Sequence, residues 1–158
     1  MGLNRNTQCK NILTTAPDIK NRYSLVEHTA DTGISLIADS LPELFELAGI
    51  ALFDILIDLK DVSPVKTWKV QASADDLPQL MVKWLSELLY LHEVKGLVAV
   101  EINVKEISGT SLTADVRGDE FDPEKHVSIE MMKAITYHKL DVSKTPDGKY
   151  KTFVIFDV

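Results

Sequence analysis

The chain has 158 residues, of which 45% are hydrophobic, and this predicts one compact domain with a buried core. No apolar run reaches the roughly 18 residues that a membrane-spanning helix requires, so we expect no association with a membrane. The formal net charge of -7 disfavours autonomous binding to RNA or DNA, because affinity for phosphate backbones comes largely from Lys and Arg.

The first 22 residues are rich in Asn, Thr and Lys and show the period of neither a helix nor a strand. We interpret residues 1–22 as a flexible leader and residues 23–158 as a single domain. The leader lacks the apolar core of a secretory signal. It contains Cys9, the single cysteine of the chain, which excludes an internal disulfide. These features predict a cytoplasmic protein.

The first predicted strand, residues 34–38, follows the polar stretch EHTADTG, and it carries apolar residues on both faces, as expected for a strand that is covered on both sides. The clearest helix comes next, at residues 40–58. Ser40 and Glu43 have the spacing of a capping box, and apolar residues then recur at helical spacing.

A strand with one polar face is predicted at residues 65–72. It precedes a second helix, which either Asp75 or Asp76 caps and which ends before Gly96.

The rest of the chain has the composition and turn residues of β-structure. Residues 97–107 and 111–120 flank the link SGT, and residues 133–142 and 149–158 flank SKTPDG, so two hairpins are expected. Two helices among about six or seven strands, without strict alternation, predict an α+β domain in which the helices pack on a mostly antiparallel sheet.

Acidic residues stand at two predicted strand ends. Asp31 precedes the strand at residues 34–38, and Asp157 is penultimate in the chain. If the last strand lies antiparallel beside that first strand, Asp157 and the terminal carboxylate of Val158 approach Asp31. Oxygen ligands of this kind select a hard ion such as Ca²⁺, Mg²⁺ or Mn²⁺. The alternative is that both Asp residues are solvated polar ends, and His28 is either a further ligand or a hydrogen-bonding turn residue.

A second group consists of Lys133, at the start of a predicted strand, with His126 and His138 on either side. A lysine at a strand edge is usually a solvated charge that guards against aggregation, and that interpretation is favoured here. The sequence contains none of the nucleotide-binding, hydrolase or zinc motifs that would indicate an independent enzyme.

Taken together, four stretches resemble the archease family in order and spacing. They are EHTADTGISLIADSLPELFELAGIALFDIL, LMVKWLSELLYL, KAITYHKLDV and the ending VIFDV. The resemblance covers nearly everything from Tyr23 to Val158. The segment SIEMMK, directly before and including Lys133, is bulkier than the family pattern, and the resemblance implies no role for Glu130, Met131 or Met132.

The resemblance implies an α+β archease fold and a non-catalytic protein cofactor of the tRNA-splicing RNA ligase, which joins 3'-phosphate and 5'-hydroxyl RNA ends. The cofactor would promote guanylation of the ligase by GTP and its multiple turnover. Asp31, Asp157 and Val158 would hold a divalent ion, with Ca²⁺ expected in the isolated protein, and His28, His126 and Lys133 are candidates for activating the partner.

Two other classes of function remain open. A chaperone-like modulator of a tRNA methyltransferase, or of other RNA-processing enzymes, would use the metal site structurally and bind through an apolar surface. A stand-alone metal-dependent hydrolase is a weaker hypothesis, because the sequence indicates neither a general base nor a pocket.

Overall fold

A computed structural model describes residues 19–27 and 31–158, and this part of the chain contains two α-helices, a short 3-10 helix (Leu59–Asp61) and ten strands. The α-helices are α3 (Leu41–Leu56) and α4 (Leu77–Lys95). The strands are β1 (Tyr23–Glu27), β2 (Asp31–Ala38), β3 (Ile57–Asp58), β4 (Lys66–Ser73), β5 (Leu97–Ile107), β6 (Ser111–Glu120), β7 (Val127–Ser128), β8 (Ala134–Ile135), β9 (Asp141–Lys144) and β10 (Tyr150–Asp157). The predicted α+β class is confirmed.

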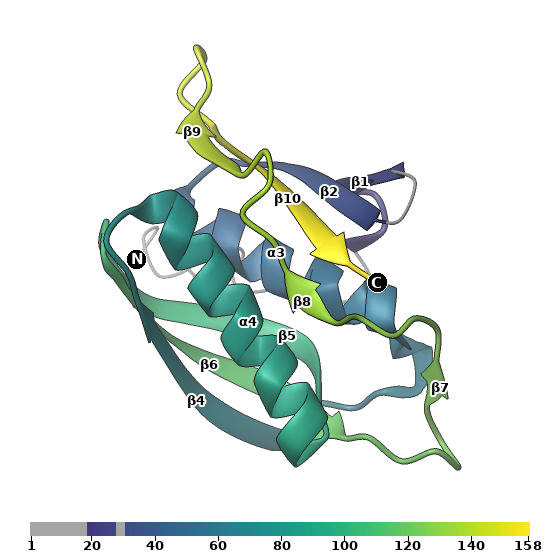
Figure 1. The fold of residues 1–158 in the computed structure, drawn as a ribbon. Helices are drawn as coiled ribbons and strands as arrows, with labels where there is room; N and C mark the ends of the chain where they lie inside the picture. Colours follow the sequence, from purple (N-terminus) through teal and green to yellow (C-terminus); the bar gives the residue numbers. More distant parts are fainter. Residues whose placement is uncertain (1–18, 28–30) are drawn as a thin grey trace.

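The strands form three sheets, and the strands of the described residues pair antiparallel within them. One sheet has the order β1-β2-β10-β8, with β9 also pairing with β10; the second has the order β4-β6-β5; and β3 pairs with β7. Helix α3 contacts β2 and β10 of the first sheet and β5 of the second, so it lies between them (Figure 1). Helix α4 packs on the second sheet and also contacts β8 and β9.

Helix α3 begins at the predicted cap Ser40, but the returning bond of Glu43 goes to Asp39, one residue before the cap N–H that a capping box uses. The Ser40 hydroxyl accepts the N–H of Glu43 at 3.3 Å, and the Glu43 carboxylate accepts the N–H of Asp39 at 2.9 Å. The helix is buried along almost its whole length, because sheets or a second helix cover most of its surface.

Helix α4 has both of its predicted ends. Asp76, rather than Asp75, caps it by accepting the N–H of Gln79 at 2.9 Å. Gly96 ends it in the left-handed region with φ 73°, a conformation that glycine adopts without steric cost. The indole N–H of Trp84 donates to the carbonyl of Phe45 at 2.8 Å and so links the two helices inside the core.

The last strand lies antiparallel beside the first predicted strand, as expected. Ile155 is opposite Gly33, and Asp157 is opposite Asp31. One expectation for β2 is wrong: Ser35 and Ile37 are exposed, so the strand is covered on one face only. The reason is that the helices cover only one side of this sheet. The expectation was based on the apolar residues that the sequence has on both faces of the strand.

The strand predicted at residues 133–142 is also wrong in extent. The range contains the two-residue strand β8, Ala134–Ile135, and the first two residues of β9, which starts at Asp141. Between them Lys139 takes a positive φ of 53°, which marks a turn that an extended strand cannot contain. Both β8 and β9 pair with β10, so the chain leaves this strand edge and returns to it.

The predicted boundary of the leader falls too late. Ile19 is buried in the hydrophobic core, and Lys20 and Arg22 form ion pairs with Asp54 at 3.1 Å and Glu43 at 3.4 Å. Residues 19–22 therefore pack on α3, and residues 1–18 lie outside the described part of the chain. Among the described residues, neither helix is long and apolar enough to cross a membrane.

Candidate functional site

Asp31 and Asp157 lie directly opposite each other at one end of the β2–β10 pair. Directly opposed residues of antiparallel strands project from the same face with their Cβ atoms about 4.5–5.5 Å apart. Both side chains are partly exposed, and by strand alternation they share the face of Ser35 and Ile37, which points away from the core. The structure therefore brings the two carboxylates together at the surface, as predicted.

Lys133 and the chain end lie at the same corner. The main-chain N–H of Lys133 donates to the main-chain carbonyl of Asp157 at 2.7 Å, and Ala134 pairs with Asp157 in β8. Val158 follows directly, with its side chain packed against the core. Figure 1 shows the C-terminus at this end of β10, next to β8. Asp31, Lys133, Asp157 and Val158 form what we call the carboxylate corner.

Packing of the neighbouring residues fixes the orientation of Asp157. Val154 and Phe156 are fully buried, so alternation along β10 directs Asp157 to the opposite, outer face. On that face a Cβ at Gly33 would lie 3.2 Å from Cζ of Phe153. The absence of a side chain at Gly33 thus allows the Phe153 ring to lie across the sheet, close to the corner.

The charges at the corner favour a cation. Within residues 19–27 and 31–158, the side chains of Asp31 and Asp157 form no ion pair with Lys or Arg. Like charges directly across a strand pair destabilise it, and a bound cation would relieve that repulsion.

The available ligands at the corner are all oxygen atoms. Oxygen ligands suit hard divalent ions such as Ca²⁺, Mg²⁺ or Mn²⁺. The described residues contain no group of three or more His, Cys, Asp or Glu side chains that could hold a metal ion. An ion at the corner would therefore need the terminal carboxylate of Val158, main-chain carbonyls or water in addition to the two Asp side chains.

The histidine candidates do not join this group among the described residues. His28 lies outside the described part of the chain. His126 is buried in the loop before β7, where its Nδ1 accepts the N–H of Asp122 at 3.0 Å and its ring lies 5.9 Å from that of Phe121. The proton of the neutral ring is therefore on Nε2, which is buried and has no hydrogen-bond partner among the described residues. His126 is thus a packed side chain that is not presented to a partner in this structure.

Comparison with known proteins places the chain in a family. The model of the archease protein family (MTH1598/TM1083) matches residues 23–158. The chain belongs to the archease family. It is 39% identical to the protein archease of Pyrococcus abyssi, over 87% of this chain and 99% of that protein, and 38% identical to the protein archease of Methanosarcina acetivorans, over 90% and 99%.

Solved structures agree with the archease assignment. The solution structure of Methanobacterium thermoautotrophicum protein 1598 is 29% identical, with a TM-score of 0.73, and the match covers 86% of this chain and 98% of that one. A crystal structure from Thermotoga maritima, described as an archease and possible chaperone, has a TM-score of 0.55 over 84% of this chain and 94% of that one. At 22% identity the latter shows the fold alone. The archease match includes the whole carboxylate corner.

One surface feature beside the carboxylate corner was not predicted from the sequence. Val127, Ile129 and Met131 are all exposed, although they alternate with polar residues in VSIEM. Such alternation was the available signal, but by itself it predicts a strand with its apolar side buried. Only the tertiary structure shows that these three side chains face outward.

Proposed function

We propose that this archease is a protein cofactor that activates the tRNA-splicing RNA ligase in the cytoplasm. The ligase joins 3'-phosphate and 5'-hydroxyl RNA ends, and the cofactor would promote its guanylation by GTP and its multiple turnover. The observation that carries the proposal is the meeting of Asp31, Asp157 and the chain end at one surface corner of an archease fold.

The geometry of the corner favours action on another protein rather than independent catalysis. The carboxylates are partly exposed at strand ends, so a phosphate group held in the site of a partner could approach them. Lys133 is exposed beside them and can direct its ammonium group toward a phosphate oxygen or an acidic residue of the partner. GTP would be bound by the ligase and not by this chain.

In this proposal Asp31, Asp157 and Val158 hold a divalent ion, with Ca²⁺, Mg²⁺ or Mn²⁺ as candidates. When bound, such an ion would supply positive charge that stabilises negative charge on phosphate oxygens. The contribution of the protein is to fix the oxygen donors: Asp31 and Asp157 are held in register by the strand pair, and Val158 is anchored by its packed side chain.

The test is a guanylation assay with purified ligase, labelled GTP and a divalent salt, followed by multiple-turnover RNA joining. Asp31→Asn and Asp157→Asn should each abolish stimulation, because each removes a charged donor while keeping the side-chain shape. Asp75→Asn provides a matched control, since Asp75 is exposed and does not cap α4. Circular dichroism should show that all three variants fold. Full stimulation by Asp157→Asn would contradict the proposal.

The exposed apolar residues Val127, Ile129 and Met131 favour a second candidate, a chaperone-like modulator of a tRNA methyltransferase or another RNA-processing enzyme. That function would depend on the apolar surface and not on the carboxylates. It would be the better explanation if the Asp variants retained all activity toward the partner enzyme.

A further inference from the structure

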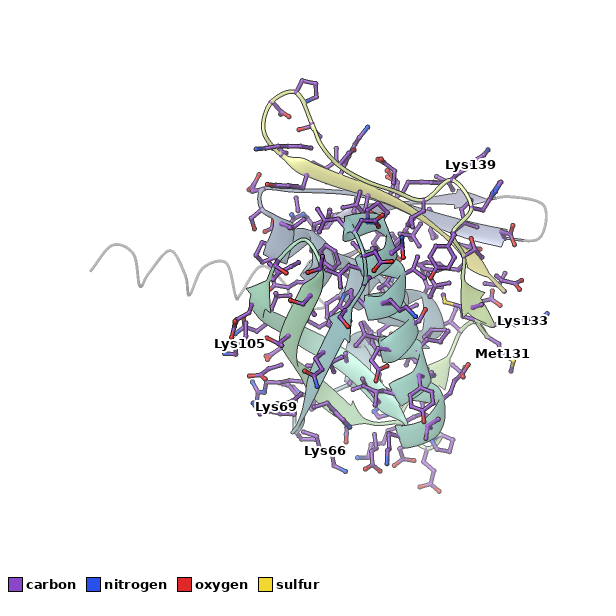
Figure 2. All side chains as sticks on the ribbon, turned by 60° about the vertical axis from the view of Figure 1, so that its left-hand side comes forward. Lys66, Lys69, Lys105, Met131, Lys133 and Lys139 are labelled. Atoms are coloured by element: carbon purple, nitrogen blue, oxygen red, sulfur yellow. The ribbon has the colours of Figure 1, made fainter. Side chains whose placement is uncertain are left out.

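A strip of three apolar side chains leads to the carboxylate corner. Val127, Ile129 and Met131 are exposed to 60%, 58% and 79%, respectively. Single exposed apolar residues are ordinary, whereas several in succession mark an interaction surface. Figure 2 shows Met131 and Lys133 on the same side of the molecule, projecting from its surface and well away from Lys66. We call Val127, Ile129 and Met131 the apolar strip.

Met131, the last residue of the apolar strip, lines a surface groove of about 470 Å³. The groove is lined by the C-terminal half of α4, by the end of α3, and by Ser128, Glu130, Met131 and Met132. Met131 and Met132 both contribute to the lining, and the unbranched methionine side chain adapts to irregular partner surfaces. The groove can therefore accept a large apolar side chain from another molecule.

The charged residues that line the groove indicate which kind of partner segment it can bind. Its charged lining residues are Glu93 and Glu130, and no Lys or Arg is among the described residues that line it. His92 also lines it and uses Nδ1 to donate to the carbonyl of Leu97 at 2.7 Å, which leaves Nε2 of the neutral ring as an acceptor. A segment with an apolar anchor flanked by Lys or Arg is complementary to this lining.

Hydrogen bonds hold the strip in a fixed relation to the carboxylate corner. The N–H of Ile129 donates to the carbonyl of Leu56 at 2.8 Å, and the N–H of Lys133 donates to the carbonyl of Asp157 at 2.7 Å. The five residues from Ile129 to Lys133 thus connect the end of α3 to the end of β10. Met131 is two residues from Lys133, a separation of at most about 7 Å along the chain. A partner that covers the strip would also meet the corner.

We propose that the apolar strip and its groove bind a segment of the partner RNA ligase in which a large apolar side chain is flanked by Lys or Arg. This contact would hold the carboxylate corner against the ligase. The inference rests on the proposed function and names the surface through which it operates.

The test separates binding from activation. Affinity for purified ligase is measured by biolayer interferometry, and guanylation is measured over a range of concentrations of this chain. The double variant Ile129→Asp/Met131→Asp should weaken affinity by about tenfold or more, as expected for loss of an apolar anchor, while stimulation at saturation remains. Glu130→Lys should also weaken binding, more strongly at low salt. Val65→Asp is the control, because Val65 is 66% exposed and belongs to neither the apolar strip nor the groove.

The outcomes distinguish this inference from the function on which it rests. Asp157→Asn should bind the ligase with unchanged affinity and fail to stimulate it. If the wild type stimulates the ligase and the double variant binds as tightly as the wild type, the docking surface is wrong and the function stands. If the wild type neither binds nor stimulates the ligase, both proposals fall. A wild-type dimer that the double variant converts to a monomer, with unchanged ligase affinity, would assign the strip to self-association and overturn the inference.

Discussion

Glu46 is an acidic residue inside the core, and its ionisation should control the pH dependence of stability. It lies on α3 and is buried, and its Oε2 accepts the N–H of Val104 at 2.8 Å. The acceptor is placed where β5 shifts register, between Val104 and Glu106. Glu46 thus satisfies a main-chain N–H beside this irregularity in the strand.

Burial raises the pKa of Glu46 from its ordinary value of 4.5 to about 7. The hydrogen bond from Val104 opposes this shift, and the nearby charge of Glu43 adds to it. The folded protein therefore keeps the Glu46 proton at pH values where the unfolded chain has lost it. Stability is highest below the unfolded pKa and decreases as the pH rises toward 7. At 1.36 kcal/mol per pKa unit, the loss amounts to about 3 kcal/mol.

We expect Glu46→Gln to remove this dependence. The amide retains an oxygen that can accept the Val104 N–H, and it resembles the protonated acid in size. Relative to the wild type, the variant should gain about 3 kcal/mol in free energy of unfolding between about pH 4.5 and about pH 8. For a domain of this size that gain corresponds to roughly 10 °C in melting temperature.

The assay is urea unfolding followed by circular dichroism at several pH values, with the wild type and both variants in the same buffers. Glu106→Gln is the control, because Glu106 is exposed on β5 and the same chemical change there should leave the difference from wild type constant. A difference between Glu46→Gln and wild type that does not grow with pH would refute the reasoning. It would mean that ionisation of Glu46 in the folded protein does not lower the free energy of unfolding.

Three further predictions concern the corner, RNA and the core. Calcium at 100 times its Kd should stabilise the wild type by about 2.7 kcal/mol through mass action, and Asp157→Asn should lose this response; an equal rise in melting temperature for both would contradict the metal site. The isolated chain should bind tRNA halves with a Kd weaker than about micromolar at physiological salt, because its net charge is -7; submicromolar binding in a fluorescence anisotropy titration would contradict this. In thermal unfolding, Gly118→Ala should destabilise the fold more than Gly49→Ala. A Cβ at Gly118 would lie 1.8 Å from the main-chain oxygen of Val98, whereas the atom nearest to a Cβ at Gly49 is the side-chain Cδ1 of Ile102, at 2.5 Å. The reverse order of stability would show that the strand backbone moves more readily than the side chains of the core.

Signals close together in the chain predicted the helices. Ser40, Asp76 and Gly96 act on residues within one turn of themselves, so their effect can be read without knowledge of the fold. The pairing of the last strand with β2, and with it the meeting of Asp31 and Asp157, is a longer-range prediction that the structure confirms. The role of these residues as metal ligands remains a prediction.

The tertiary structure alone decided which surfaces are covered. His126 and Ile19 are buried while Met131 is exposed, yet local sequence assigned Ile19 to a leader and His126 to a site. The strand predicted at residues 133–142 is divided because β8 and β9 separately pair with β10 around the turn at Lys139. Burial and pairing depend on segments that are distant in the chain, whereas capping and periodicity are properties of neighbours. For that reason the sequence determined the helices and the acidic strand ends, and only packing decided that an apolar strip lies open beside them.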